Sequence, residues 1–568
     1  MHRHCTLLTV SLLLTGALIA SACSSESNGT ASPSSPTQGP VVTEASPPSA
    51  PPVTNVAEQP SCALPTTTTP VSAADFGNDR DWDITSFDGT VIRAHWFPLV
   101  GAAAGATAPT VLMGPGWGGG GDTNENAPGL LGAISIKTLR DHGYNVLTWD
   151  PRGWGESTGT AQIDSVDFEA RDVQQLLDWV ATRPEAALDS DGDPRSGMVG
   201  TSYGGGIQIV TAAIDCRVDA IVPIIAWNSL STSLYKAQTP KSGWGNLLML
   251  AANAARLDPI IRRVSESGLT TGVVDPADAE WMAARGPGDL VSDIAIPTLI
   301  IQGTIDTLFT LDEGVANYAL LQSSGAPVAM LWFCGGHGVC LTDAGDSGRI
   351  SEAAIGWLDR YVKNDESITP LTGFEFVDQD GASYSAAGFP EADGTAITAS
   401  GNGVLELVAN GGAGPAVSDS GSTDLIDVVA LSITPGRATN AVDVTISANI
   451  IIPAIVVGAP HLSFTYSGTG ESGERPTRVF AQLVDDKTGR VLGNQITPIE
   501  VILDGATHTV DVALETVAFR FDPRTTVTLQ IVATTVAYVQ PRLGGSIDFT
   551  DVVISLPVVT VKEILSVD

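Results

Sequence analysis

The residues best suited to nucleophilic chemistry lie in Gly200-Thr201-Ser202-Tyr203-Gly204, which fits the pattern G-x-S-x-G. An apolar run precedes this segment and a helix-like run follows it. Glycines allow a sharp turn from strand to helix, where a Cβ would clash, and such a turn lifts the serine hydroxyl to the edge of a sheet. We therefore predict that Ser202 is a nucleophile. The alternative is a glycine-rich turn with an incidental serine.

A serine hydroxyl needs a base, and the base needs an acid that orients it. Of the seven histidines, only His337 follows a late predicted strand in a glycine-rich loop. Asp306 lies in the loop after the preceding predicted strand, whereas the competing Asp312 is typical of the first turn of the next helix. The order Ser202, Asp306, His337 is the chain order of an α/β-hydrolase triad. We expect His337 to act as the base and Asp306 to hold its ring.

Negative charge that develops on the substrate oxygen needs hydrogen-bond donors. We predict that one donor is the backbone N–H of Tyr203, directly after the nucleophile. The second donor is expected near Trp117, in the loop Gly114-Pro115-Gly116-Trp117-Gly118-Gly119. The alternative for this loop is a structural glycine-rich turn.

The elements that must position these residues alternate between strands and helices, which is typical of an α/β fold with a mostly parallel sheet. We assign residues 76–366 to this hydrolase domain, with an inserted cap at about 229–293, where the alternation breaks into helix-like pieces. Helices are expected at 168–180 and 350–362. Strands are expected at 91–99, 110–113, 145–149, 197–201, 221–225, 298–302 and 328–333.

The composition changes after about residue 370. All 11 tryptophans lie between Trp82 and Trp357, and the remaining chain is rich in Thr, Val, Ile, Gly and Asp, with turn signals between β-rich runs. We predict an all-β jelly-roll domain over 367–568.

The first 22 residues resemble a bacterial lipoprotein signal. One basic residue, Arg3, precedes a short apolar run that ends at Ala20-Ser21-Ala22-Cys23. Lipid attachment at Cys23 would anchor the protein at the outer face of the membrane, and the alternative is an ordinary secretory signal that is cut at the same place. Residues 23–75 are rich in Pro, Ser and Thr and predict an extended tether. Both interpretations place the protein outside the cytoplasm.

The charge excludes some partners. The chain of 568 residues has 28 Lys+Arg against 63 Asp+Glu, a formal charge of −35. Nucleic-acid binding needs clustered cations, so no nucleic acid is expected. Contact with a membrane is expected only through the lipid anchor, and the sequence does not indicate an oligomeric state. We expect neither a metal nor a cofactor.

The motifs together resemble the X-prolyl dipeptidyl-peptidase/cocaine-esterase group of serine hydrolases. They comprise Trp149-Asp150-Pro151-Arg152-Gly153-Trp154-Gly155-Glu156-Ser157, the Ser202 segment, Gln302-Gly303-Thr304-Ile305-Asp306 and Gly335-Gly336-His337. The resemblance covers about residues 80–560 and implies an α/β-hydrolase with a helical cap and a jelly-roll domain near the active-site rim. In the esterase branch, a tyrosine hydroxyl helps to form the oxyanion hole. The matching loop here carries Trp117, which leaves the second donor open.

The cysteines predict disulfides. Cys5 leaves with the signal and Cys23 would carry lipid, so four remain in an oxidising compartment, with three ways of pairing. We favour Cys334–Cys340, around the His337 loop, and Cys62–Cys216, which would tie the tether to the hydrolase domain. The alternative is a buried free thiol at Cys216.

These observations predict an exported serine hydrolase that forms an acyl-enzyme at Ser202. Its substrate would be an acyl ester or a short peptide cleaved after X-Pro, and ester or broad acyl hydrolysis is favoured slightly. One alternative is a dedicated X-Pro dipeptidyl-peptidase. A second is a non-catalytic surface lipoprotein whose β domain binds a partner.

Overall fold

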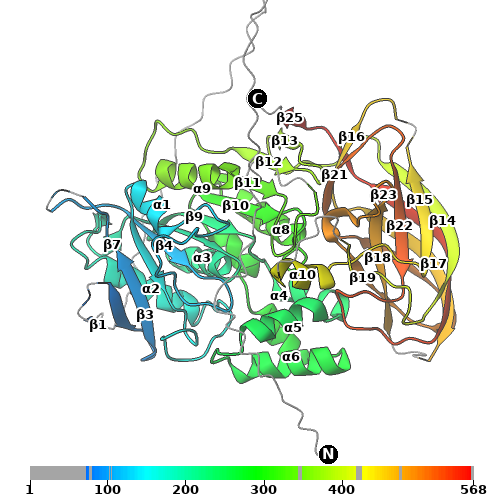
Figure 1. Cartoon of the computed structure of the whole chain (residues 1–568), viewed down its shortest axis with the longest axis horizontal. Coiled ribbons are helices and arrows are strands. Elements are labelled where there is room, and N and C mark those ends of the chain that lie inside the picture. The colour runs from blue at the N-terminus through cyan, green and yellow to red at the C-terminus, as the bar shows by residue number, and fades with distance from the viewer. Residues whose placement is uncertain are drawn as a thin grey trace, which may run out of the picture.

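The computed structural model describes residues 72–564, except for 76–77, 79, 102, 104, 343–347, 418–424, 449 and 472–475. Within this part, an α/β domain with a helical cap lies beside a domain built mainly of β-strands (Figure 1). The predicted fold class is confirmed. The predicted signal peptide, Cys23, most of the tether and Cys62 lie outside the described residues.

The α/β domain is organised around one sheet of 12 strands in the order β1-β2-β3-β5-β4-β8-β9-β10-β11-β12-β13-β25. Its central strands are short apolar runs that pair in parallel from β5 to β12, as expected for a sheet covered on both faces. The strands are β1 (Ala73–Asp75), β2 (Asp81–Thr85), β3 (Val91–Phe97), β4 (Thr110–Gly114), β5 (Asn145–Trp149), β8 (Ser196–Thr201), β9 (Val218–Ile224), β10 (Thr298–Gly303), β11 (Val328–Phe333), β12 (Gly373–Val377), β13 (Ser383–Ala386) and β25 (Lys562–Ile564). A small hairpin, β6 (Leu188–Ser190) and β7 (Asp193–Pro194), lies apart from this sheet.

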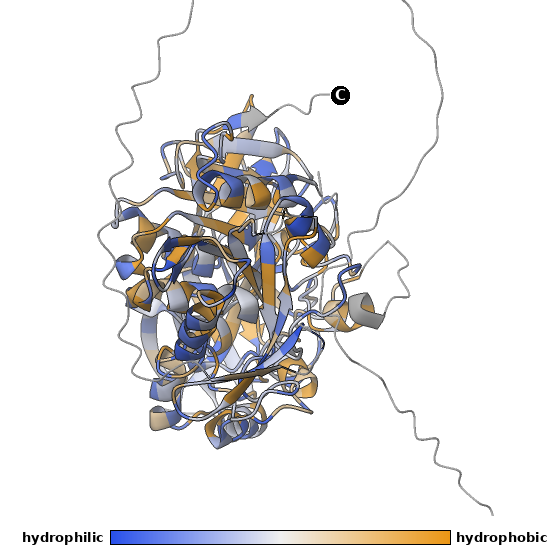
Figure 2. Ribbon diagram, turned by 90° about the vertical axis from the view of Figure 1, so that its left-hand side faces the viewer, coloured by the Kyte–Doolittle hydropathy of each residue, from blue (hydrophilic) through white to orange (hydrophobic). Residues whose placement is uncertain are grey.

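Helices cover both faces of the sheet, and two separate apolar clusters fill the space between helices and strands. In Figure 2, hydrophobic residues lie on interior strands, and the helices carry both hydrophobic and hydrophilic residues. These helices are α1 (Ile136–Asp141), α2 (Glu169–Val180), α3 (Tyr203–Ile214), α8 (Leu311–Gln322) and α9 (Gly348–Tyr361).

The predicted cap contains four α-helices between β9 and β10. They are α4 (Leu230–Leu234), α5 (Ser242–Ala251), α6 (Pro259–Thr271) and α7 (Pro276–Ala283), with the 3-10 turns η1 (Lys236–Gln238) and η2 (Gly288–Asp293). Aspartate side chains and proline start α6 and α7: Asp258 and Asp275 accept hydrogen bonds from the first turns.

The second domain packs two four-stranded antiparallel sheets, β14-β23-β17-β20 and β15-β22-β18-β19, around a separate apolar core, and β21-β16-β24 forms a third sheet. One helix, α10 (Leu425–Ser432), lies beside the cap (Figure 1). The strands are β14 (Ile397–Glu406), β15 (Ala441–Ser447), β16 (Ala454–Gly458), β17 (His461–Gly470), β18 (Thr477–Asp485), β19 (Thr497–Val501), β20 (Asp504–Ala513), β21 (Val517–Phe521), β22 (Thr526–Val532), β23 (Gly545–Leu556) and β24 (Val558–Val559), with η3 (Leu492–Asn494).

The large sheet crosses two boundaries predicted from the sequence. Strand β1 lies inside the predicted tether of 23–75, yet it pairs with β2 of the hydrolase domain. Beyond residue 366, β12 and β13 extend the sheet, and β25 returns to it from the end of the described chain. These strands are too short to have a distinctive composition, so composition alone places them in the β domain. Their backbone pairing instead joins them to the hydrolase sheet.

The disulfide Cys334–Cys340 is present, as predicted, with a Cα–Cα distance of 5.6 Å. Cys216 also takes part in a disulfide, which rules out the free thiol, and its expected partner Cys62 is outside the described residues. No helix in the described ranges is long and apolar enough to cross a membrane.

A buried polar cluster joins the β domain to the hydrolase domain. The Glu515 carboxylate lies 2.8 Å from Lys236 Nζ and accepts a hydrogen bond of 2.9 Å from the Thr310 hydroxyl. The Thr516 hydroxyl donates to Asp312 at the start of α8. The side chain of Glu515 is only 2% exposed. Burial would raise the pKa of Glu515, but the charge of Lys236 lowers it, so Glu515 stays ionised in the interface.

Lys236→Met should therefore leave Glu515 buried without its cation. We expect the free energy of unfolding to fall by about 3 kcal/mol, because the buried carboxylate would then lack a compensating charge for its lost hydration. Urea unfolding followed by tryptophan fluorescence measures the change. The control is Lys137→Met, whose partner Asp141 is 60% exposed; it should cost less than about 1 kcal/mol. Equal effects of the two substitutions would contradict the assignment.

Candidate active site

Ser202 occupies a strained turn between β8 and α3. Its backbone angles are φ 57° and ψ −118°, a conformation that non-glycine residues adopt rarely. The turn is held by a hydrogen bond of 2.9 Å from Ser202 N–H to the carbonyl of Ile224 on the neighbouring strand. A side chain at Gly204 would place its Cβ 2.1 Å from the carbonyl oxygen of Gly114. The glycines of the motif thus let two backbone segments approach beneath the serine.

The structure brings Ser202, His337 and Asp306 together in one hydrogen-bonded line. His337 Nε2 lies 2.8 Å from Ser202 Oγ, and His337 Nδ1 lies 2.7 Å from Asp306 Oδ2. The His337 ring packs edge-on against Trp244 and Phe309, which limits its rotation. This arrangement fits a base that accepts the serine proton through Nε2 while Nδ1–H donates to the carboxylate.

The Asp306 carboxylate has no solvent exposure and is fully bonded by the protein. Its Oδ1 accepts the N–H groups of Leu308 and Phe309 at 2.9 Å, and its Oδ2 accepts the N–H of His337 at 3.0 Å. Gly336, at φ +121°, makes room for this contact, since a Cβ there would lie 2.6 Å from Asp306 Cβ. Asp312 lies in the first turn of α8, as expected for the residue that is not the triad acid.

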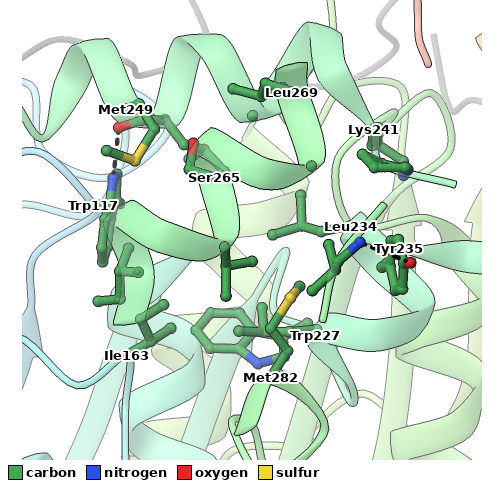
Figure 3. A pocket seen from close by; sticks show the side chains of 18 of the residues that line it. Trp117, Ile163, Trp227, Leu234, Tyr235, Lys241, Met249, Ser265, Leu269 and Met282 are labelled. Carbon is green, nitrogen blue, oxygen red and sulfur yellow. Dashed lines mark hydrogen bonds between the residues drawn. The ribbon is translucent and has the colours of Figure 1, made fainter. Parts of the chain in front are cut away.

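The two residues predicted to supply oxyanion donors, Tyr203 and Trp117, line the same cavity as Ser202. In the described part of the chain, the N–H groups of Tyr203 and Trp117 have no hydrogen-bond acceptor. The indole N–H of Trp117 instead donates to the carbonyl of Leu248 in the cap, at 2.9 Å (Figure 3). The predicted Trp117 donor can therefore only be its backbone N–H, because the side chain is engaged elsewhere.

A cavity of about 140 Å³ opens beside Ser202, between the sheet edge and cap helices α4 to α7. Figure 3 shows apolar side chains converging on it from several helices. Its apolar lining includes Trp117, Ile163, Trp227, Leu234, Leu248, Met249, Val264, Leu269, Trp281 and Met282. Among the residues that the structure describes, Lys241 is the one cationic residue of the lining, and no Asp or Glu takes part in it.

Sequence reasoning missed the buried polar residues that support these loops. Lys241 Nζ donates to the carbonyls of Thr307 and Leu308 at 3.0 Å, and burial lowers the pKa of this amine. Behind Tyr203, burial raises the pKa of Glu169 to about 7. Both residues stand among polar neighbours in the sequence, so no local pattern distinguishes them from the exposed charged residues that such segments usually carry.

Comparisons with known proteins give one family model and several relatives of similar sequence or fold. Residues 88–338 match the model of the X-Pro dipeptidyl-peptidase (S15) family. A polyketide transferase of Penicillium sp. is 27% identical over 145 residues, which are 25% of this chain and 44% of that protein. An uncharacterised protein of Pseudomonas aeruginosa is 28% identical over 119 residues, 21% of this chain and 29% of that protein. The chain thus spans less than half the length of these curated relatives.

Solved structures share the two-domain fold at low sequence identity. A CocE/NonD family hydrolase from Staphylococcus aureus aligns with a TM-score of 0.60 and 14% identity, over 84% of this chain and 93% of that one. An α-amino acid ester hydrolase aligns with a TM-score of 0.60 and 13% identity, over 87% and 99% of the two chains. An aminopeptidase from a Thaumarchaeota archaeon aligns with a TM-score of 0.61 and 11% identity, over 89% of this chain and 100% of that one.

The family match spans the serine, aspartate and histidine segments, and the structural likeness extends to the β domain. Residues 88–338 are thus similar to the X-Pro dipeptidyl-peptidase (S15) family, and the chain has an α/β-hydrolase fold followed by a β domain, as in the CocE/NonD family hydrolase and the α-amino acid ester hydrolase.

Proposed function

We propose that this protein is a serine hydrolase that cleaves esters of apolar acyl groups through an acyl-enzyme at Ser202. The observation that carries the proposal is the hydrogen-bonded line from Asp306 through His337 to Ser202, which ends at the wall of an apolar cavity. A nucleophile, a base and an orienting acid at these distances supply what acyl transfer requires.

In the proposed reaction, Ser202 Oγ attacks the ester carbonyl as its proton passes to His337 Nε2. The carbonyl oxygen becomes an oxyanion that accepts hydrogen bonds from the N–H groups of Tyr203 and Trp117. When the tetrahedral intermediate collapses, the C–O bond breaks and His337 gives the proton to the leaving alcohol. Water then attacks the acyl-enzyme with His337 as base and releases the carboxylic acid and free Ser202.

The lining of the cavity favours an ester over an X-Pro dipeptide. A dipeptidyl-peptidase must hold a free ammonium group, and burying a charge without a counter-ion is costly. The described lining contains no carboxylate, and the Lys241 amine is bound to the carbonyls of Thr307 and Leu308. An X-Pro dipeptidyl-peptidase remains the second candidate because the family match carries that description.

We also propose that the enzyme acts outside the cytoplasm, anchored through lipid at Cys23. The apolar run before Ala20-Ser21-Ala22-Cys23 and the Pro/Ser/Thr-rich stretch after it support this location. The disulfide Cys334–Cys340 also fits an oxidising compartment. A non-catalytic surface protein would need none of the geometry at Ser202.

A fluorophosphonate probe should label the wild-type chain, and Ser202→Ala should abolish labelling and lower kcat by about 10⁶-fold, because the serine and its base act as one unit. Ser265→Ala is the matched control, since Ser265 lines the same cavity. The control should label as the wild type does. A folded wild-type chain that does not label would support the non-catalytic alternative.

Turnover of p-nitrophenyl esters should increase with acyl chain length until the cavity is filled, and X-Pro p-nitroanilides should be poor substrates. Val264→Trp fills part of the cavity and should shift the preference to shorter chains. Val273→Trp is the control, because Val273 is 48% exposed and is absent from the lining. Faster cleavage of the anilide than of every ester would instead favour the dipeptidyl-peptidase.

Trp117→Pro removes a backbone N–H and should lower kcat by about 10²–10³-fold, the usual effect of losing one oxyanion donor. Trp117→Phe keeps the N–H and an aromatic ring but loses the indole bond to Leu248, so its kcat should stay within a few-fold of the wild type. Steady-state kinetics with a short-chain ester compares the two. A larger loss of kcat in Trp117→Phe would show that the indole, rather than the backbone, supports the reaction.

A further inference from the structure

The segment that carries Asp306 is bound along its backbone by side chains from other parts of the fold. After β10, residues 304–310 leave the sheet, so their carbonyl groups have no strand partner. Four consecutive carbonyls accept side-chain hydrogen bonds instead. The Asp306 carbonyl accepts from Gln495 at 2.8 Å, those of Thr307 and Leu308 accept from Lys241, and that of Phe309 accepts from Gln302. Buried carbonyl groups need such partners.

Gln495 is unusual among these donors because it belongs to the β domain. It lies between η3 and β19 and is 6% exposed. Its backbone N–H donates to the carbonyl of Leu492, and this hydrogen bond holds the backbone from which the side chain projects. The preceding residue, Asn494, reaches the other catalytic loop, with its Nδ2 3.5 Å from the carbonyl of Val339, two residues after His337.

The β domain therefore contacts the Asp306 loop and the His337 loop through two adjacent residues, Gln495 and Asn494. The contact to Asp306 is the shorter one, and it is made to the residue that carries the carboxylate rather than to a neighbour. A rotation of the Asp306 peptide would turn the carboxylate away from His337 Nδ1, now 2.7 Å distant. Misplacement of about 1 Å in such a group can cost about 10²-fold in rate.

We propose that Gln495 is a positioning residue for catalysis, through which the β domain holds the Asp306 carboxylate in line with His337. The inference rests on the proposed hydrolase function and deepens it. It assigns the β domain a role in the chemical step, in addition to its packing against the cap. Gln495 touches no reacting atom and acts only through the backbone of Asp306.

The test replaces the amide by a thioether of similar length. Gln495→Met should lower kcat for a p-nitrophenyl ester by about 10-fold or more and leave KM within about two-fold, since the apolar cavity does not include residue 495. The matched control is Gln482→Met. Gln482 is also buried in the β domain, but its amide donates to the Gly436 carbonyl and to Gln530, within the same domain.

The control should lose thermal stability comparable to that of Gln495→Met and keep the wild-type kcat. An unchanged kcat in folded Gln495→Met, or an equal fall of kcat in both variants, would overturn the proposal. The wild-type chain is assayed first with the same ester and with a fluorophosphonate. If it neither turns over nor labels, the proposed function fails and the role of Gln495 with it. An active wild type with an unaffected Gln495→Met overturns only the role of Gln495.

Discussion

The hydrogen bond between Asp306 and His337 is the contact on which the proposed chemistry depends, and its carboxylate acceptor has no exposure to solvent. A buried carboxylate is stable only if its oxygens find donors, and here three backbone N–H groups and the imidazole provide them. The same donors fix the direction of the carboxylate. Burial and orientation are therefore two consequences of one arrangement.

This arrangement needs distant parts of the chain. The β10 and β11 loops bring the acid and the base to one edge of the sheet, the cap supplies Lys241 and Trp244, and the β domain supplies Gln495. The buried cluster of Glu515 and Lys236 docks that domain beside the start of α8. The cap has a second role, since its helices form most of the apolar cavity at Ser202 (Figure 3).

The central strands could be predicted closely because each is a short apolar run with β-branched residues and a turn at its end. Strand β5 has the expected bounds, and β4, β8, β10 and β11 differ by at most one residue at either end. The cap was predicted less well. The sequence predicts helix-like pieces at about 229–293 without giving their bounds, and the structure resolves them into four α-helices, α4 to α7. The predicted boundary between residues 366 and 367 separates β12 and β13 from the sheet that they extend, since composition does not report backbone pairing.

The sequence by itself determined the order of Ser202, Asp306 and His337, the glycines that their turns require, and the disulfide Cys334–Cys340. These features are local, because each depends on residue types at short spacing and on the strand that precedes them. Only the tertiary structure decided that the indole of Trp117 is bound to Leu248, that the described residues of the cavity wall include no carboxylate, and that Gln495 reaches Asp306. Those contacts join residues more than 100 positions apart, and their geometry follows from how whole domains pack, which no local pattern encodes.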